Sequence, residues 1–122
     1  MTSDHPVPSE APLRERLRAA LKAAMKARDR GAVSALRSTL GAIDNAEAVD
    51  IGAVKAGALE DSPVGLGAAE VRRRDLTEAD VEDIVRREIE ERRTAAAEYV
   101  RAGAVERGDQ LIAEADALTA LL

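Results

Sequence analysis

The sequence predicts an all-α protein made of two antiparallel helical hairpins, about four helices in all. Apolar residues recur at intervals of three and four along most of the chain, which is the period of a helix. Hydrophobic residues make up 46% of the 122 positions but aromatic residues only 1%, so Ala, Leu, Val and Ile must form the core. Such side chains suit close helix packing, whereas strands favour aromatic and β-branched residues that are sparse here.

The first hairpin begins with a helix expected from about Glu10 to Arg28, with leucines at helical spacing and Ser9 as its N-cap. Gly31 is the expected break after this helix. A second apolar series then predicts a helix that continues to about Ala48. Because the connection between the two helices is short, we expect them to pack antiparallel.

The periodicity then stops, and residues 50–76 are expected to form a flexible linker. Four glycines and Pro63 interrupt this stretch, and no helical or strand period is sustained through it. Residues 1–8 are expected to be a flexible tail. The remaining chain is interpreted as one domain with three parts: a first hairpin at 9–49, the linker at 50–76 and a second hairpin at 77–122.

The second hairpin is expected to start at Thr77, an N-cap followed by acidic residues near the positive end of a helix. This helix should end near Gly103, and a last helix should start at about Glu106. The solvent face of the longer helix should carry three pairs in which an acid precedes a base by four residues. These pairs are Glu82 with Arg86, Asp83 with Arg87, and Glu88 with Arg92. The chain finishes on three leucines that we interpret as an exposed apolar end for self-association: Leu118, Leu121 and Leu122.

The composition argues against several classes of active site. The chain has no cysteine, which excludes disulfides, a thiol nucleophile and cysteine metal ligands. Its one histidine, His5, lies in the tail, and no serine has the neighbours of a known nucleophile motif. We therefore expect no catalytic residue, no metal site and no cofactor. An apolar run of the ~20 residues needed to cross a membrane is also missing, so we expect a cytoplasmic protein without membrane contact.

Charge is distributed unevenly along the chain. The formal net charge is −5, which by itself disfavours nucleic acid as a partner. Residues 9–31, however, hold seven basic and three acidic residues, a charge of +4, whereas residues 77–122 hold six basic and twelve acidic, a charge of −6. Basic residues recur every fourth position along the first helix, and we call them the basic stripe: Arg14, Arg18, Lys22, Lys26 and Arg30.

Two interpretations of the basic stripe remain open at this point. Like charges four residues apart on a helix repel one another, so they need solvent or an acidic partner. In the first interpretation an acidic neighbouring helix or solvent compensates them, and in the second a phosphate backbone or an acidic partner protein does. Other basic residues join the stripe as candidates for binding: Arg37, Arg72, Arg73 and Arg74. The last three are flanked by Glu70 and Asp75, which favours a solvated role for them.

Several short motifs, in this order and spacing, resemble the GatB/YqeY family. The first half contributes Leu21-Lys22-Ala23-Ala24-Met25-Lys26-Ala27-Arg28-Asp29, then Leu36-Arg37-Ser38 and Ala42-Ile43. The second half contributes Leu76-Thr77-Glu78-Ala79-Asp80-Val81, Arg87-Glu88-Ile89, Arg92-Arg93 and Tyr99-Val100-Arg101-Ala102-Gly103. The resemblance covers residues 13–122 outside the linker.

This resemblance implies an all-helical protein related to a segment near the end of the B subunit of the glutamine-dependent Asp/Glu-tRNA amidotransferase. In that enzyme the tail engages tRNA and performs no chemistry, so we interpret the family label of carbon-nitrogen ligase with glutamine as amide donor as inherited. The expected function is a non-catalytic module of tRNA-dependent amidation that binds tRNA or an amidotransferase-like protein. The alternative is a structural or regulatory protein-interaction module with no RNA role.

Overall fold

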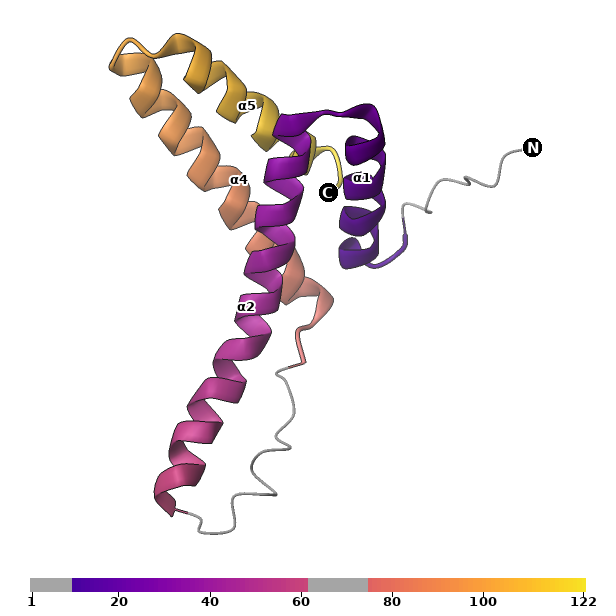
Figure 1. Ribbon diagram of the computed structural model, residues 1–122, viewed down its shortest axis with the longest axis vertical. Helices are drawn as coiled ribbons and strands as arrows, with labels where there is room; N and C mark the ends of the chain where they lie inside the picture. The colour runs from indigo at the N-terminus through magenta and orange to yellow at the C-terminus, as the bar shows by residue number, and fades with distance from the viewer. Residues whose placement is uncertain (1–9, 62–74) are drawn as a thin grey trace, which may run out of the picture.

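The computed structural model describes residues 10–61 and 75–122, with side chains at 10–48 and 75–122. The described residues form an all-α structure, as predicted (Figure 1). Its helices are α1 (Leu13–Ala27), α2 (Arg30–Asp61), α4 (Glu78–Arg101) and α5 (Val105–Thr119). After α1 the chain turns back, and α2 packs beside α1. After α4 it turns back again, and α5 packs beside α4, so both predicted hairpins are confirmed.

Helix α1 begins at Leu13, three residues later than expected. Pro12 occupies the N-cap position with φ −52° and ψ 143° and provides no side-chain cap. The predicted cap, Ser9, lies outside the described residues. In its place the Glu78 carboxylate accepts the backbone N–H of Leu13 at 2.6 Å, from 65 positions away. An acidic group near a helix N-terminus also interacts favourably with the helix dipole, so the start of α1 depends on α4.

The first hairpin turns at Arg28, which makes the predicted break at Gly31 wrong. Arg28 adopts the left-handed conformation, with φ 59°. Its N–H donates to the carbonyl of Met25 and the next N–H donates to that of Ala24, the bonding pattern of a Schellman motif. Asp29 then caps α2, because its Oδ1 accepts the N–H of Ala32 at 3.1 Å.

This turn also corrects the composition of the basic stripe. Arg30 is the first residue of α2 and Gly31 the second, so Arg30 is not on the first helix. The four-residue spacing of the stripe therefore ends at Lys26, one residue before the last residue of α1.

The predicted linker is wrong for residues 50–61, which continue α2 as far as Asp61. Glycine in a helix costs up to about 1 kcal/mol relative to Ala. Extending an existing helix, however, adds a hydrogen bond for each residue that is fixed. The extension therefore tolerates the glycines at 52 and 57. Residues 62–74, including Arg72, Arg73 and Arg74, lie outside the described residues, as does the predicted tail at 1–8.

Both ends of α4 lie where the sequence predicts them. Thr77 Oγ1 accepts the N–H of Asp80 at 3.0 Å, while Asp80 Oδ2 accepts the N–H of Thr77 at 2.9 Å. This reciprocal capping box closes the start of the helix. At the other end Gly103 has φ 89°, a conformation that glycine adopts without a steric penalty. Its N–H donates to the carbonyl of Val100 and completes a second Schellman motif.

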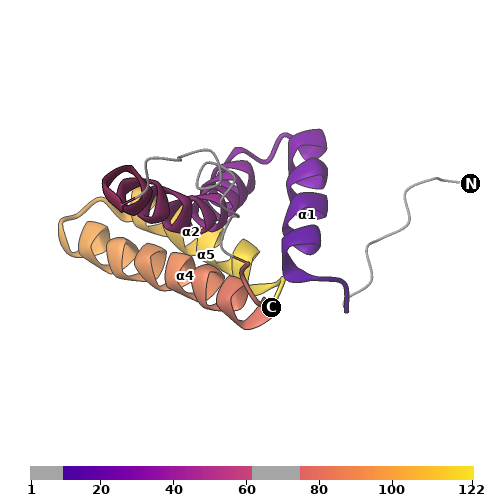
Figure 2. The same cartoon turned by 90° about the horizontal axis from the view of Figure 1, so that it is seen from below.

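Figure 2 shows the arrangement of the four helices from below. The core between them is built from aliphatic side chains. Its most buried members include Leu13 and Leu17 of α1, Ile43 of α2, Val85 of α4 and Leu118 of α5. The C-terminal leucines therefore do not form the exposed end that we expected. Leu118 is fully buried, Leu121 packs against the core and only Leu122 is exposed. Arg16 secures this end of the chain by donating from Nη1 to the carbonyl of Leu121.

Gly108 marks a close approach between α5 and α4. A Cβ built at this buried residue would lie 2.6 Å from Val100 Cγ2 and 3.1 Å from the carbonyl oxygen of Ala96. The Val100 side chain is able to shift, but the Ala96 oxygen belongs to the backbone of α4. A core of small aliphatic side chains needs such contacts, because it contains no aromatic ring to fill a wider gap.

We expect Gly108→Ala to lower the free energy of unfolding by about 1–3 kcal/mol, the usual cost of overpacking. The matched control is Gly41→Ala on α2, where a Cβ would meet nothing within 4 Å. That variant should be more stable by about 0.5–1 kcal/mol, because Ala is the better helix former. Urea denaturation followed by circular dichroism measures both. A Gly108→Ala protein as stable as Gly41→Ala would contradict the close packing of α4 on α5.

Candidate functional site

Arg14, at the start of the basic stripe, is paired within the chain. Its Nη2 lies 2.9 Å from Oε2 of Glu47 on α2, and its side chain is only 26% exposed. Arg14 Nε and Nη2 are buried without hydrogen-bond partners, so the contact is ionic and not a well-directed hydrogen bond. For this residue the structure favours the first interpretation of the stripe, neutralisation by a neighbouring helix.

The rest of the stripe moves around α1 toward solvent. Four residues advance a helix by slightly more than one turn, so each successive cation lies further from the side where Arg14 meets α2. Arg18, Lys22 and Lys26 are all exposed. Arg18 and Lys22 form no hydrogen bond or ion pair with any residue that the structure describes. Solvent or an external ligand must therefore compensate these two charges.

An open pocket lies at the turn between α1 and α2, and we call it the basic pocket. Three arginines contribute to it: Arg28 from the turn, Arg30 from the first position of α2 and Arg37 from two turns further along. Three smaller side chains complete the lining: Met25, Val33 and Ser34. All three arginines are exposed, and none pairs with a carboxylate in the described part of the chain.

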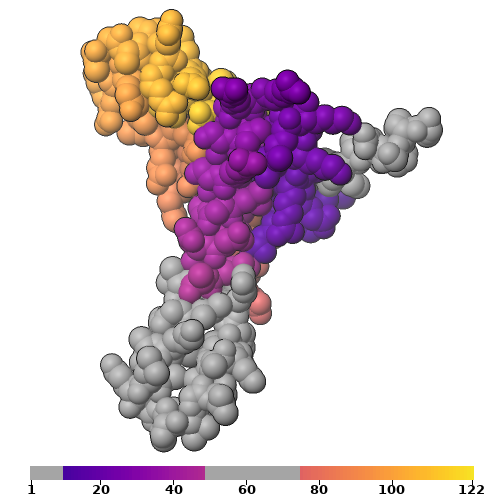
Figure 3. Space-filling model, viewed as in Figure 1, coloured from indigo at the N-terminus to yellow at the C-terminus, as the bar shows by residue number. Residues whose placement is uncertain are grey.

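The chain around the basic pocket is strongly positive. Between positions 16 and 43 there are seven Lys or Arg residues and one acidic residue, Asp29. The Asp29 side chain is held at the start of α2 by the N–H of Ala32. In the space-filling view the α1–α2 turn forms the upper end of the indigo and purple part of the molecule, and the tip of the acidic α4–α5 hairpin projects separately at the upper left (Figure 3). Such a separation of charge directs anionic ligands toward one end of a protein.

The structure therefore brings together only part of the predicted site. Arg30 and Arg37 line the basic pocket, and Lys22 and Arg18 precede Met25 by three and seven residues on the same side of α1. Arg14 does not belong to this group, because it is paired with Glu47 of α2. Sequence reasoning missed Arg28 and Met25 as site residues. These two residues reach the pocket because the chain turns at Arg28. A left-handed turn is seldom predictable from sequence when the residue is not glycine.

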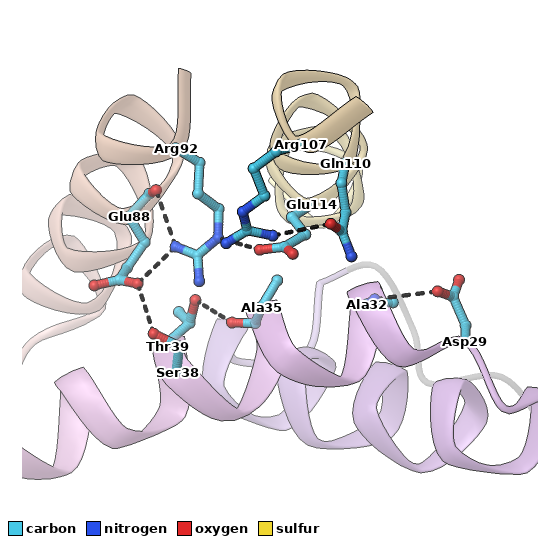
Figure 4. Close-up of polar contacts among 10 residues, drawn as sticks. All are labelled: Asp29, Ala32, Ala35, Ser38, Thr39, Glu88, Arg92, Arg107, Gln110 and Glu114. Carbon is cyan, nitrogen blue, oxygen red and sulfur yellow. Dashed lines mark hydrogen bonds and ion pairs between the residues drawn. The ribbon is translucent and has the colours of Figure 1, made fainter. Parts of the chain in front are cut away.

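A second polar cluster is buried where α2, α4 and α5 meet, and we call it the Arg92 network (Figure 4). Arg92 donates from Nη1 to Glu88 Oε1 at 2.8 Å and from Nε to Glu114 Oε1 at 3.1 Å. Ser38 of α2 donates to the same Glu88 oxygen at 3.1 Å. The side chains of Arg92, Glu88 and Glu114 are 12%, 14% and 7% exposed. The predicted pairing of Glu88 with Arg92 is therefore confirmed, but its predicted position on the solvent face is wrong.

The Arg92 network has the geometry of a structural element. One guanidinium satisfies both carboxylates, which leaves neither of them positioned as a free acid or base in the way that catalysis requires. Within residues 10–61 and 75–122 there is also no group of three or more His, Cys, Asp or Glu that could hold a metal ion. No helix in the same ranges combines the length and apolarity needed to cross a membrane.

No protein-family model matches this chain, and no curated protein or solved structure does either. The resemblance to the GatB/YqeY family therefore rests on the motifs of the sequence.

We expect Arg92→Met to lower the free energy of unfolding by about 3–5 kcal/mol, because it leaves the buried carboxylate of Glu114 and the largely buried one of Glu88 uncompensated. Arg86→Met is the matched control: Arg86 also pairs with an acid four residues earlier, Glu82, but the two side chains are 59% and 45% exposed. Its loss should stay below about 1 kcal/mol. Thermal and urea denaturation compare the two variants. Equal losses of unfolding free energy would show that the Arg92 pairs stabilise the fold no more than an exposed ion pair does.

Proposed function

We propose that this chain is a non-catalytic helical module of GatB/YqeY type that binds tRNA in the cytoplasm, in or near tRNA-dependent amidation. The family part of this proposal rests on the motif resemblance. The binding part rests on one observation, the basic pocket with Arg18 and Lys22 beside it. Together they place five cations on the α1–α2 hairpin, and none of the five is paired with a carboxylate in the part of the chain that the structure describes. The net charge of the whole chain is −5.

Phosphate is the ligand that fits these cations best. Arginine presents a planar fork of donors that matches phosphate oxygens in a bidentate way, and it is less strongly hydrated than lysine. Arg28, Arg30 and Arg37 extend from different backbone positions toward one pocket, so they are able to contact one phosphate group or two neighbouring ones. A nucleic acid bound in this way releases counterions, and its affinity falls as salt rises.

The proposal predicts salt-dependent tRNA binding that the basic pocket controls. The triple variant Arg28→Ala, Arg30→Ala and Arg37→Ala should bind tRNA more weakly and with a flatter dependence on salt. Each lost phosphate contact should reduce the slope of log affinity against log salt by about 0.7–0.9. Binding is measured by fluorescence anisotropy at about 50 mM and about 200 mM salt, the range over which such contacts change affinity most visibly.

A matched variant controls for the overall change in charge. Arg86→Ala, Arg87→Ala and Arg101→Ala remove the same number of positive charges from exposed positions of α4, and tRNA binding should stay close to that of the unmodified protein. An equal loss in both triple variants would mean that the attraction is unspecific. No binding by the unmodified protein at the lower salt would remove tRNA as the partner of this chain.

A second candidate function, a protein-interaction module without an RNA role, has support from a different surface. Four large apolar residues are exposed at the end of α4 and along the first half of α5, around the tip of the hairpin: Tyr99, Val100, Val105 and Ile112. Val105 and Ile112 are seven residues apart and therefore lie on one side of α5. Neighbouring exposed apolar side chains are typical of interaction sites.

Under this second candidate the tip mediates self-association. Sedimentation velocity should then show a species larger than the monomer at micromolar concentration. The double variant Val105→Ser and Ile112→Ser should shift the protein toward the monomer, whereas Leu122→Ser, an exposed leucine outside the tip, should not. A monomer at every concentration would remove this support for the alternative.

A further inference from the structure

The basic pocket has a lining that a site for the phosphate backbone alone does not need. Its cations surround two apolar side chains, Met25 and Val33. Met25 is 49% exposed, and Val33 is partly exposed. Backbone binding is satisfied by positive charge without an apolar surface. The ligand of this pocket should therefore have an apolar part as well as an anionic part.

The charged and apolar parts of the pocket are in direct contact. Arg37 Nη2 lies 3.9 Å from Met25 Sδ, so this guanidinium is next to the thioether. Ser34 lies three residues before Arg37, on the same side of α2, and adds a hydroxyl able to donate or accept a hydrogen bond. A ligand that fills the pocket therefore meets cations, an apolar surface and a hydroxyl within a short distance of one another.

From this arrangement we infer that the basic pocket binds a single unpaired nucleotide, an inference that rests on the proposed RNA-binding function. The guanidiniums of Arg28, Arg30 and Arg37 contact the phosphate, and the base lies against Met25 and Val33. Bases in a duplex are stacked inside the helix, and the deep major groove of RNA is closed to side chains. Only an unpaired base exposes a face to such a surface, and any base provides one.

The same chemistry separates a nucleotide from the main competing ligand, an acidic peptide with an apolar side chain. Arginine stacks on planar groups and binds phosphate through two parallel hydrogen bonds. A thioether is polarisable and adapts to the face of an aromatic ring. A pocket of three arginines and a methionine therefore suits a phosphate joined to a flat ring better than a flexible carboxylate side chain.

The test compares two RNA probes with the full chain: a fluorescent single-stranded oligoribonucleotide of mixed sequence and the blunt duplex of the same sequence. The unmodified protein should bind the single strand more tightly than the duplex. Stacking of one base on an aromatic side chain contributes roughly 5- to 100-fold, and the aliphatic surface of this pocket should give a preference toward the lower end of that range. Met25→Gln keeps the length and helix propensity of the side chain but removes its apolar end. This variant should lose most of the preference while its affinity for the duplex stays unchanged.

Met25→Leu is the control, because it retains an apolar surface on a good helix former, and it should keep the preference for the single strand. Equal affinity for both probes, or a preference that survives Met25→Gln, would overturn the inference even if salt-dependent tRNA binding persists. No binding of either probe or of tRNA at low salt would instead overturn the proposed function. Displacement of the single strand by an acidic, leucine-containing peptide but not by a mononucleotide would reassign the pocket to a peptide.

Discussion

The guanidinium of Arg92 is the interaction on which the pairing of α4 with α5 in the second hairpin depends. It holds two buried carboxylates, one on its own helix and one on α5, while Ser38 adds a contact from α2. The core around it consists of small aliphatic side chains that fit together in many similar ways. A buried network must satisfy every member, so it accepts fewer arrangements than apolar packing does. The Arg92 network thereby restricts how α5 lies against α4, and the hydrogen bond from Ser38 to Glu88 connects the two helices to α2.

The basic pocket depends on a different local feature, the turn at Arg28. A left-handed residue there ends α1 and lets Asp29 cap α2 without a longer loop. The turn directs Arg28 and Arg30 to one side and brings Arg37 beside Met25. The only acidic residue in this stretch is used as a cap. The charge of the hairpin end therefore stays exposed, while α4 and α5 carry the acidic excess of the chain.

Local signals in the sequence were sufficient for most of the fold. Helical periodicity identified the four helices, because burying one face of a helix requires apolar residues at that spacing. Thr77 and Gly103 marked the ends of α4, since their roles depend on nearby backbone groups only. The end of α2 was missed because its extension to Asp61 has no apolar period, and glycine-rich segments of this kind resemble loops in sequence.

Composition and short-range spacing were enough to predict the helices, the aliphatic core and the concentration of positive charge near the first hairpin. Which charged side chains are paired inside the protein depends instead on how the helices pack together. Glu82 with Arg86 and Glu88 with Arg92 have the same spacing, yet the first pair is exposed and the second is buried. Arg14 is likewise paired with Glu47, whereas Arg28, Arg30 and Arg37 form a pocket. Burial of a charged group depends on the helix packed opposite to it, and the spacing of residues along one helix contains no information about that neighbour.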